Sequence, residues 1–184
     1  MTAALCWRGA GDATRARAAL QRARTLAASF TAVEQLPLDL LDGDLLLDAA
    51  QENAALQLAQ RLRVLAPASR AALHLQARAL LAMPRSPATL DFLRQQTVLH
   101  PHDVDLWRWR AQAEAAAGKG AAQHRATAEA YALQGNLEGA IVQLKIAQTT
   151  PDTDYFEASI VDARLNLFKQ RLARDKILDK MIPQ

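Results

Sequence analysis

Apolar residues recur along the chain at the three- and four-residue spacings of amphipathic helices, and no segment alternates as a strand would. Turn signals separate the apolar segments: Pro67, MPRSP, HPHD, GKG, QGN and TTPD. The pattern predicts helices at about residues 13–28, 38–50, 53–65, 69–83, 87–99, 103–117, 121–134 and 137–149, and a last one from 155 to beyond 172. We therefore expect an all-α protein.

The helical segments repeat with a fixed step of 34 residues. Positions that share this step have the same chemistry: small Gly43, Ala77 and Ala111, apolar Leu46 and Leu80, bulky Leu73 and Trp107, and the turn prolines Pro67 and Pro101. This step is typical of tetratricopeptide repeats, in which paired antiparallel helices stack into a superhelix. We expect such an α-solenoid as a single domain over residues 1–184, closed by a C-terminal capping helix.

The segment AEAYALQGNLEGAIVQLKIA, residues 128–147, is an example of one predicted hairpin. Ala128 and Ala140 are small enough for two helix backbones to approach closely. Gly135 suits a left-handed turn after the first helix, and the side chain of Asn136 can cap the second.

Two places depart from the regular step. Ala128 follows Ala111 by half a repeat, so the helix that contains Tyr131 should end one hairpin and open the next. At the start, MTAALCWR is short for a hairpin helix, which usually has about a dozen residues. We therefore expect Met1 to be an artificial start and the chain to be a C-terminal fragment of a longer protein.

The last helix has apolar residues on one stripe, with three more nearby and charged residues elsewhere. The stripe contains Phe156, Ile160, Ala163 and Leu167 and extends toward Gln170, and the nearby residues are Val161, Leu165 and Phe168. A helix that ends a solenoid is expected to turn a polar face outward.

Composition and charge exclude several classes of protein. Hydrophobic residues make up 51% of the chain but aromatic residues only 5%, which favours closely packed helices over a core of bulky rings. The net charge of +3 comes from 22 basic and 19 acidic residues, a balance that argues against nucleic-acid binding. The single cysteine, Cys6, excludes an intrachain disulfide and a thiolate zinc cage. No run approaches the roughly 20 apolar residues of a membrane span, and the first residues lack a signal-peptide layout.

The sequence has no catalytic motif, since HExxH, GxSxG, CxxC and a glycine-rich phosphate loop are all missing. His100, His102 and Asp103 are close in sequence and would be the residues of a metal-dependent hydrolase. Two histidines in one loop rarely complete a coordination shell. We favour a turn in which Asp103 caps the next helix, and we predict no catalytic residue, no metal site and no cofactor in this chain.

The first helices of the hairpins should line the concave face of the solenoid, where such proteins hold an extended peptide or another protein. Solvated side chains without a partner are the alternative interpretation of the same positions. The inward-facing residues predicted as the binding surface are of mixed sign: Asp44, Asp48, His74, Arg78, Asp105, Arg108, Gln112, Arg125 and Glu129.

The last third of the chain has a more specific pattern, HRATAEAYALQGNLEGAIVQLKIAQ followed by DYFEASIVDARL. It resembles the C-terminal tetratricopeptide portion of bacterial zinc metallopeptidases of the β-barrel assembly-enhancing protease type. The matching residues are His124, Arg125, Ala126, Ala128, Glu129, Tyr131, Leu133, Gly135, Leu137, Ala140, Gln143, Leu144, Ala147, Tyr155, Ala163, Arg164 and Leu165.

The resemblance implies a periplasmic parent protein with zinc in a peptidase domain that this chain lacks. It implies a non-catalytic module that recruits outer-membrane protein substrates or components of the β-barrel assembly machinery. The alternative is a standalone tetratricopeptide scaffold or adaptor, unrelated to proteolysis.

Overall fold

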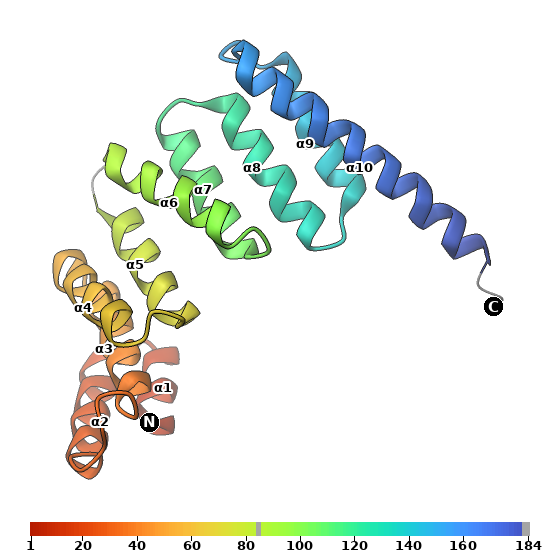
Figure 1. Cartoon of the computed structure of the whole chain (residues 1–184). Helices are drawn as coiled ribbons and strands as arrows, with labels where there is room; N and C mark the ends of the chain where they lie inside the picture. The colour runs from red at the N-terminus through yellow and green to blue at the C-terminus, as the bar shows by residue number, and fades with distance from the viewer. Residues whose placement is uncertain (84–85, 182–184) are drawn as a thin grey trace. The chain divides into compact units, whose positions relative to one another are not determined.

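The structure is a computed structural model that describes residues 1–83 and 86–181, with side chains up to residue 178. Helices and turns make up the described residues, without a strand. The helices are α1 (Thr2–Gly9), α2 (Ala13–Leu26), α3 (Leu36–Asp48), α4 (Glu52–Leu65), α5 (Arg70–Ala82), α6 (Pro87–Leu99), α7 (Val104–Ala116), α8 (Gly120–Leu133), α9 (Leu137–Thr149) and α10 (Tyr155–Met181) (Figure 1). None of these described helices is long and apolar enough to cross a bilayer.

The chain divides into two units, Met1–Pro84 with α1 to α5 and Arg85–Gln184 with α6 to α10. Within each unit, every helix packs against the next one along the chain. In addition α3 contacts α5 and α8 contacts α10, as helices one hairpin apart do in a solenoid. The expected fold class, an all-α solenoid of antiparallel pairs, is confirmed, and the single domain over residues 1–184 stays a prediction.

The step of 34 residues fixes where the helices begin. Helices α3, α5 and α7 start at Leu36, Arg70 and Val104, each 34 residues after the one before. The small residues of the repeat are buried, and Gly43 shows the reason. A Cβ atom at Gly43 would lie 2.3 Å from Cδ2 of Leu75 on α5, so the two helices approach where a side chain is missing.

The hairpin of α8 and α9 has the predicted turn. Gly135 has a φ of +81°, and the Gly139 backbone N–H donates a hydrogen bond of 2.8 Å to the Asn136 side chain. Ala128 and Ala140 are fully buried between the helices. Helix α8 packs against both α7 and α9, which confirms that it ends one hairpin and opens the next.

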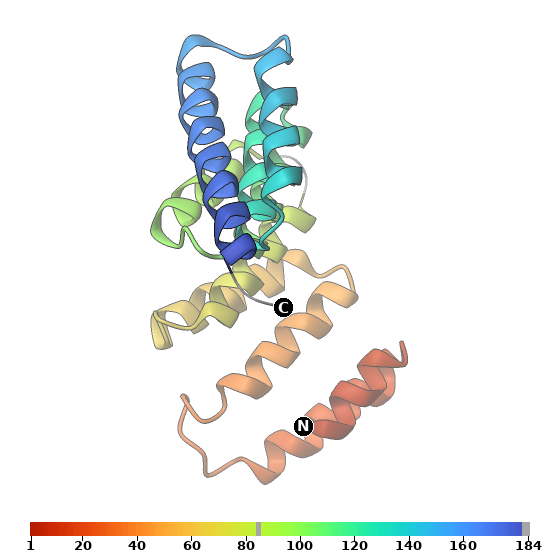
Figure 2. The ribbon, with the colours of Figure 1, turned by 90° about the vertical axis from the view of Figure 1, so that its right-hand side faces the viewer.

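Helix α10 leaves an apolar face exposed, although a polar outer face was expected. It packs against α9 through Val161, Leu165 and Phe168, and Figure 2 shows the two helices side by side. The predicted stripe is exposed: Phe156, Ile160, Ala163 and Leu167. The expectation of a polar outer face was therefore wrong, because this helix has two apolar faces and its neighbours cover only one.

A buried carboxylate joins α6 to α7. Glu114 is fully buried and accepts hydrogen bonds from Nε and Nη2 of Arg94 at 2.9 and 2.8 Å. Nε of Arg110 lies 3.4 Å from Oε1 of the same carboxylate, and its Nη1 donates to the Thr97 hydroxyl at 2.9 Å. The hydrogen bond to Glu114 raises the pKa of Arg94, whereas burial lowers the pKa of Arg110. Two guanidinium groups therefore share one buried acceptor.

We expect Glu114→Ala to lower the free energy of unfolding by about 3 kcal/mol, because both guanidinium groups would lose their buried counter-charge. Gln112→Ala is the control, since this exposed position on the same helix should change stability by no more than about 0.5 kcal/mol. Urea unfolding followed by circular dichroism measures both variants. Equal stability of the two would contradict a stabilising role for the Glu114 cluster.

Candidate functional site

The nine predicted binding residues lie on four helices. In the first unit, α3 contains Asp44 and Asp48 and α5 contains His74 and Arg78; in the second, α7 contains Asp105, Arg108 and Gln112 and α8 contains Arg125 and Glu129. The hydrogen-bond and ion-pair partners of these residues differ between the two units. The role of these residues in binding stays a prediction.

In the first unit, Asp44 links three helices. Its Oδ1 atom accepts a hydrogen bond of 2.5 Å from Nη1 of Arg78 on α5, and its Oδ2 atom accepts one of 2.8 Å from Nη1 of Arg8 on α1. The Asp44 side chain keeps 25% of its surface exposed. One carboxylate thus connects the first helices of successive hairpins through their polar faces.

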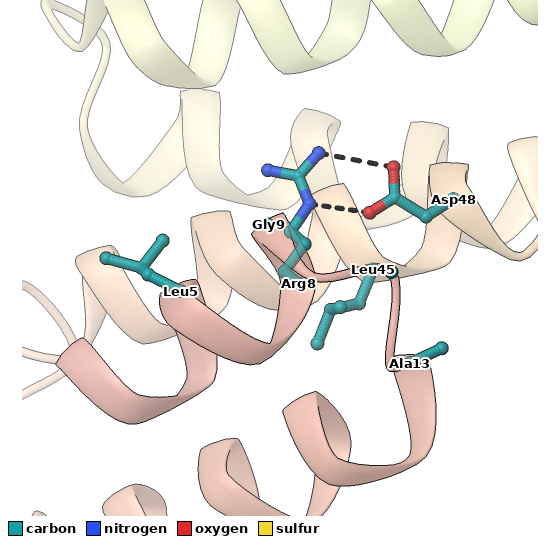
Figure 3. A pocket seen from close by; sticks show the side chains of 7 residues that line it. Leu5, Arg8, Gly9, Ala13, Leu45 and Asp48 are labelled. Carbon is teal, nitrogen blue, oxygen red and sulfur yellow. Dashed lines mark hydrogen bonds and ion pairs between the residues drawn. The ribbon is translucent and has the colours of Figure 1, made fainter.

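Arg8 also holds Asp48, one turn further along α3. Its Nε atom donates to Oδ2 at 2.5 Å and its Nη2 atom to Oδ1 at 3.2 Å, a two-point contact drawn in Figure 3. The hydrogen bonds from Arg8 lower the pKa of Asp48, and they raise the pKa of Arg8. The pair is partly exposed, so both groups remain within reach of a ligand.

This ion pair lies at the edge of a hollow between α1 and α3 with a volume of about 490 Å³ (Figure 3). Leu45 is buried and Leu5 is half exposed, so the hollow has apolar walls beside its charged edge. The residues that line it are Leu5, Arg8, Gly9, Gly11, Ala13, Leu45 and Asp48. A concave space of this size, lined by polar and apolar surface in similar amounts, can hold a side chain of a ligand.

The local sequence explains why the hollow is open. Helix α1 ends at Gly9, and Gly11 adopts a φ of +75° that reverses the chain. Asp12 then caps α2 by accepting a hydrogen bond of 2.9 Å from the Arg15 backbone N–H. The two glycines place no side chain into the space.

Sequence reasoning missed Arg8 as a member of this face. The GAGD turn that follows Arg8 was a usable signal, because a turn there returns α2 along α1 and leaves Arg8 at the end of a first helix. His74, which was predicted, accepts a hydrogen bond of 3.2 Å at Nε2 from Nε of Arg70.

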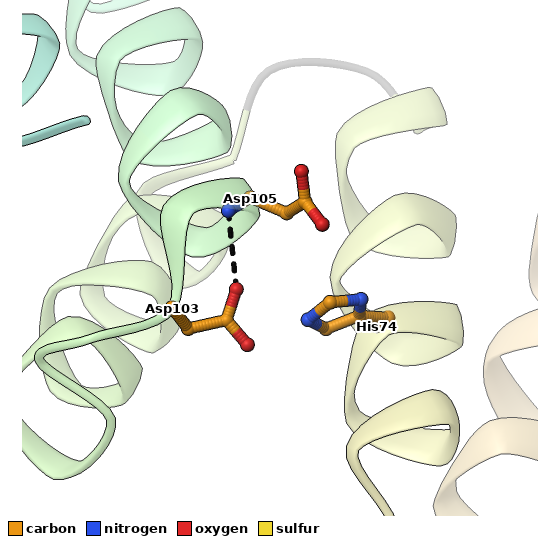
Figure 4. A group of neighbouring side chains, drawn as sticks. All are labelled: His74, Asp103 and Asp105. Carbon is orange, nitrogen blue, oxygen red and sulfur yellow. Dashed lines mark hydrogen bonds between the residues drawn. The ribbon is translucent and has the colours of Figure 1, made fainter. Parts of the chain in front are cut away.

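In the second unit the predicted residues of α7 are exposed or half exposed. Nη1 of Arg108 lies 3.6 Å from Oδ1 of Asp105, one turn away on the same helix. Gln112 follows on the exposed side of α7. Asp103 caps α7 as predicted, since its carboxylate accepts hydrogen bonds from the backbone N–H of Asp105 (Figure 4) and from that of Leu106. The side chains of Asp105, Arg108 and Gln112 form a partly exposed polar surface on α7.

The predicted residues of α8 are buried, and α10 provides their partners. Arg125 forms an ion pair with Glu157, and Glu129 forms one with Arg164. A ligand could reach these two residues only after displacing α10. Their visible role is to hold α10 against α8.

Replacing Asp48 with Asn should reduce the dependence of stability on pH. The pKa of Asp48 in the folded chain lies below its ordinary value, so its stabilisation is present above about pH 4 and is lost as the pH falls further. The effect should be about 0.5 kcal/mol or less, because solvent screens a partly exposed pair.

Thermal unfolding between pH 3 and pH 6, roughly the range in which carboxylates titrate, measures this effect. The two proteins should differ at the upper end and converge at the lower end. A constant difference across the range would contradict it. Asp91→Asn, at an exposed position of the second unit, is the matched control.

Comparison with known proteins defines the fold. No protein-family model matches the chain. No curated protein matches it either. The chain is similar in structure to a thermophilic tetratricopeptide-repeat protein of Thermus thermophilus, with a TM-score of 0.52 and 16% sequence identity over 88% of this chain and 95% of that one. The chain has the fold of a tetratricopeptide-repeat solenoid.

Proposed function

We propose that the chain is a non-catalytic module that binds a segment of another protein on the polar face of α1, α3 and α5. The observation that carries this proposal is the hollow of about 490 Å³ between α1 and α3, with apolar walls and the Arg8–Asp48 pair at its edge. Solenoids of helical pairs offer extended surfaces of this kind to polypeptides.

The chemistry of the face suits a polypeptide better than a polyanion. Two arginines, Arg8 and Arg78, and two aspartates, Asp44 and Asp48, leave the set without net charge. Guanidinium groups can donate to the carbonyl groups of an extended chain, and carboxylates can accept from its N–H groups. An apolar side chain of the ligand would occupy the hollow beside Leu5 and Leu45.

Filling the hollow should weaken binding without loss of the fold. Ala13 is an exposed residue of α2 that lines the hollow, and Ala18 is exposed on the same helix outside it. Ala13→Leu should reduce the affinity for a bound peptide about tenfold, because the added side chain takes the space of the anchor. Ala18→Leu should leave the affinity unchanged.

The probe is a random peptide library displayed on phage and selected against the full chain. Selected peptides should share an apolar anchor residue, and fluorescence anisotropy measures their affinity for the three proteins. The proposal fails if no peptide is enriched, or if Ala13→Leu and Ala18→Leu bind the peptides equally well.

A finer proposal concerns the parent protein. We propose a periplasmic zinc metallopeptidase of the β-barrel assembly-enhancing protease type, whose repeat module recruits outer-membrane proteins or their assembly machinery. Its support is the residue pattern between His124 and Leu165. Zinc would belong to the peptidase domain, and this chain would contribute no ligand.

The coding sequence upstream of residue 1 tests the finer proposal. It should contain a signal peptide and an HExxH helix. A reading frame without either would favour the second candidate, a standalone scaffold, and would leave the peptide-binding proposal intact.

A further inference from the structure

Helix α10 has an exposed apolar surface, the outer stripe, formed by Phe156, Ile160, Ala163 and Leu167. Phe156 is 77% exposed, and Ile160 and Leu167 are 44% and 47% exposed. Tyr155 extends the apolar surface, because its ring packs edge-to-face on Phe156 at 5.9 Å between centroids. Contiguous apolar residues that face solvent typically mark an interaction surface.

The spacing of the outer stripe is that of a helix-pairing seam. Its residues follow one another at steps of four, three and four, which places them along one line on the helix. Ala163 lies inside this line and adds little bulk, so a second helix could approach closely there. The face formed by Val161, Leu165 and Phe168 is occupied by α9, so the two faces serve different contacts.

The distribution of charge along α10 and the turn before it favours a second copy of this helix as the partner. From Asp152 to Ala163 all four charged residues are acidic, and from Arg164 to Lys176 five of six are basic. Beyond the two ends of the outer stripe, Asp152 and Asp154 lie in the turn that leads into α10, and Arg171 and Arg174 lie on α10 after Leu167. A second copy of α10 in antiparallel orientation would place the acidic end of each helix opposite the basic end of the other. A parallel copy would bring like charges together.

We propose that two copies of this chain associate through an antiparallel pair of α10 helices. The two-fold axis passes between Ile160 and Ala163, so that Phe156 meets the partner's Leu167 and Ile160 meets the partner's Ala163. Each contact joins a larger and a smaller side chain, and all four residues of the outer stripe become buried. A two-fold contact of this type is self-complementary and closes without further growth. This dimer contact uses no residue of the hollow between α1 and α3.

Sedimentation equilibrium of the full chain, from micromolar to millimolar concentration, tests the association. We expect a monomer that converts to a dimer as concentration rises. Ala163→Glu should raise the dissociation constant about tenfold or more, because it buries a carboxylate in the seam. Ala173→Glu is the matched control, because Ala173 is exposed on another side of the same helix; it adds a carboxylate to the basic end without entering the seam, so its dissociation constant should rise only about twofold.

The orientation has its own test. With Cys6→Ser and a spin label at Gln170→Cys, an exposed position beside the seam, the antiparallel pair should give a label separation of roughly 27 Å, whereas a parallel pair would give roughly 10 Å. Circular dichroism of every variant establishes that the helices remain folded. A monomer at all concentrations, a dimer equally affected by the Ala163 and Ala173 substitutions, or the short separation would each overturn the proposal.

Discussion

The close approach of helix backbones at small residues is the constraint on which the rest of the structure depends. Gly43 receives the Leu75 side chain of α5, and Ala128 and Ala140 are fully buried where α8 meets α9. With few aromatic rings to fill space, the helices must pack closely to bury apolar surface. This packing determines which side chains of each helix face outward and are left for binding.

Charged residues reinforce the packing in two different ways. In the first unit, the carboxylates of Asp44 and Asp48 are partly exposed and join helices at the surface. In the second unit, Glu114 and Glu129 are buried with arginines as partners. Contacts with water or a ligand can replace an exposed ion pair at little cost in free energy. Breaking a buried ion pair leaves a buried charge with neither a partner nor water. The first unit is therefore the better place for a binding surface.

Much of the fold could be predicted from the sequence because the repeat fixes local geometry. The start of α5 at Arg70, the Gly135 turn and the Asp103 cap all depend on residues within one or two turns. The ion pairs could not be predicted in this way. Arg8 meets Asp48 across 40 residues, and Arg164 meets Glu129 across 35, so their partners follow only from the packed arrangement.

For the candidate binding surface too, the helix on which a residue lies could be predicted, whereas its burial by a distant helix could not. Counting along the repeat placed Asp44, Asp48 and Arg78 on first helices, where the structure has them. The same count could not distinguish the exposed Arg108 from the buried Arg125, because burial of Arg125 depends on α10. For α10 itself, two apolar stripes of similar strength compete, and the sequence alone does not say which one α9 covers.

The shared carboxylate of Asp44 has a mechanical consequence. Because it holds arginines from both α1 and α5, a ligand cation that competes for it would loosen two helix contacts in one step. Binding of such a cation and the stability of the contacts among α1, α3 and α5 would then be linked quantities.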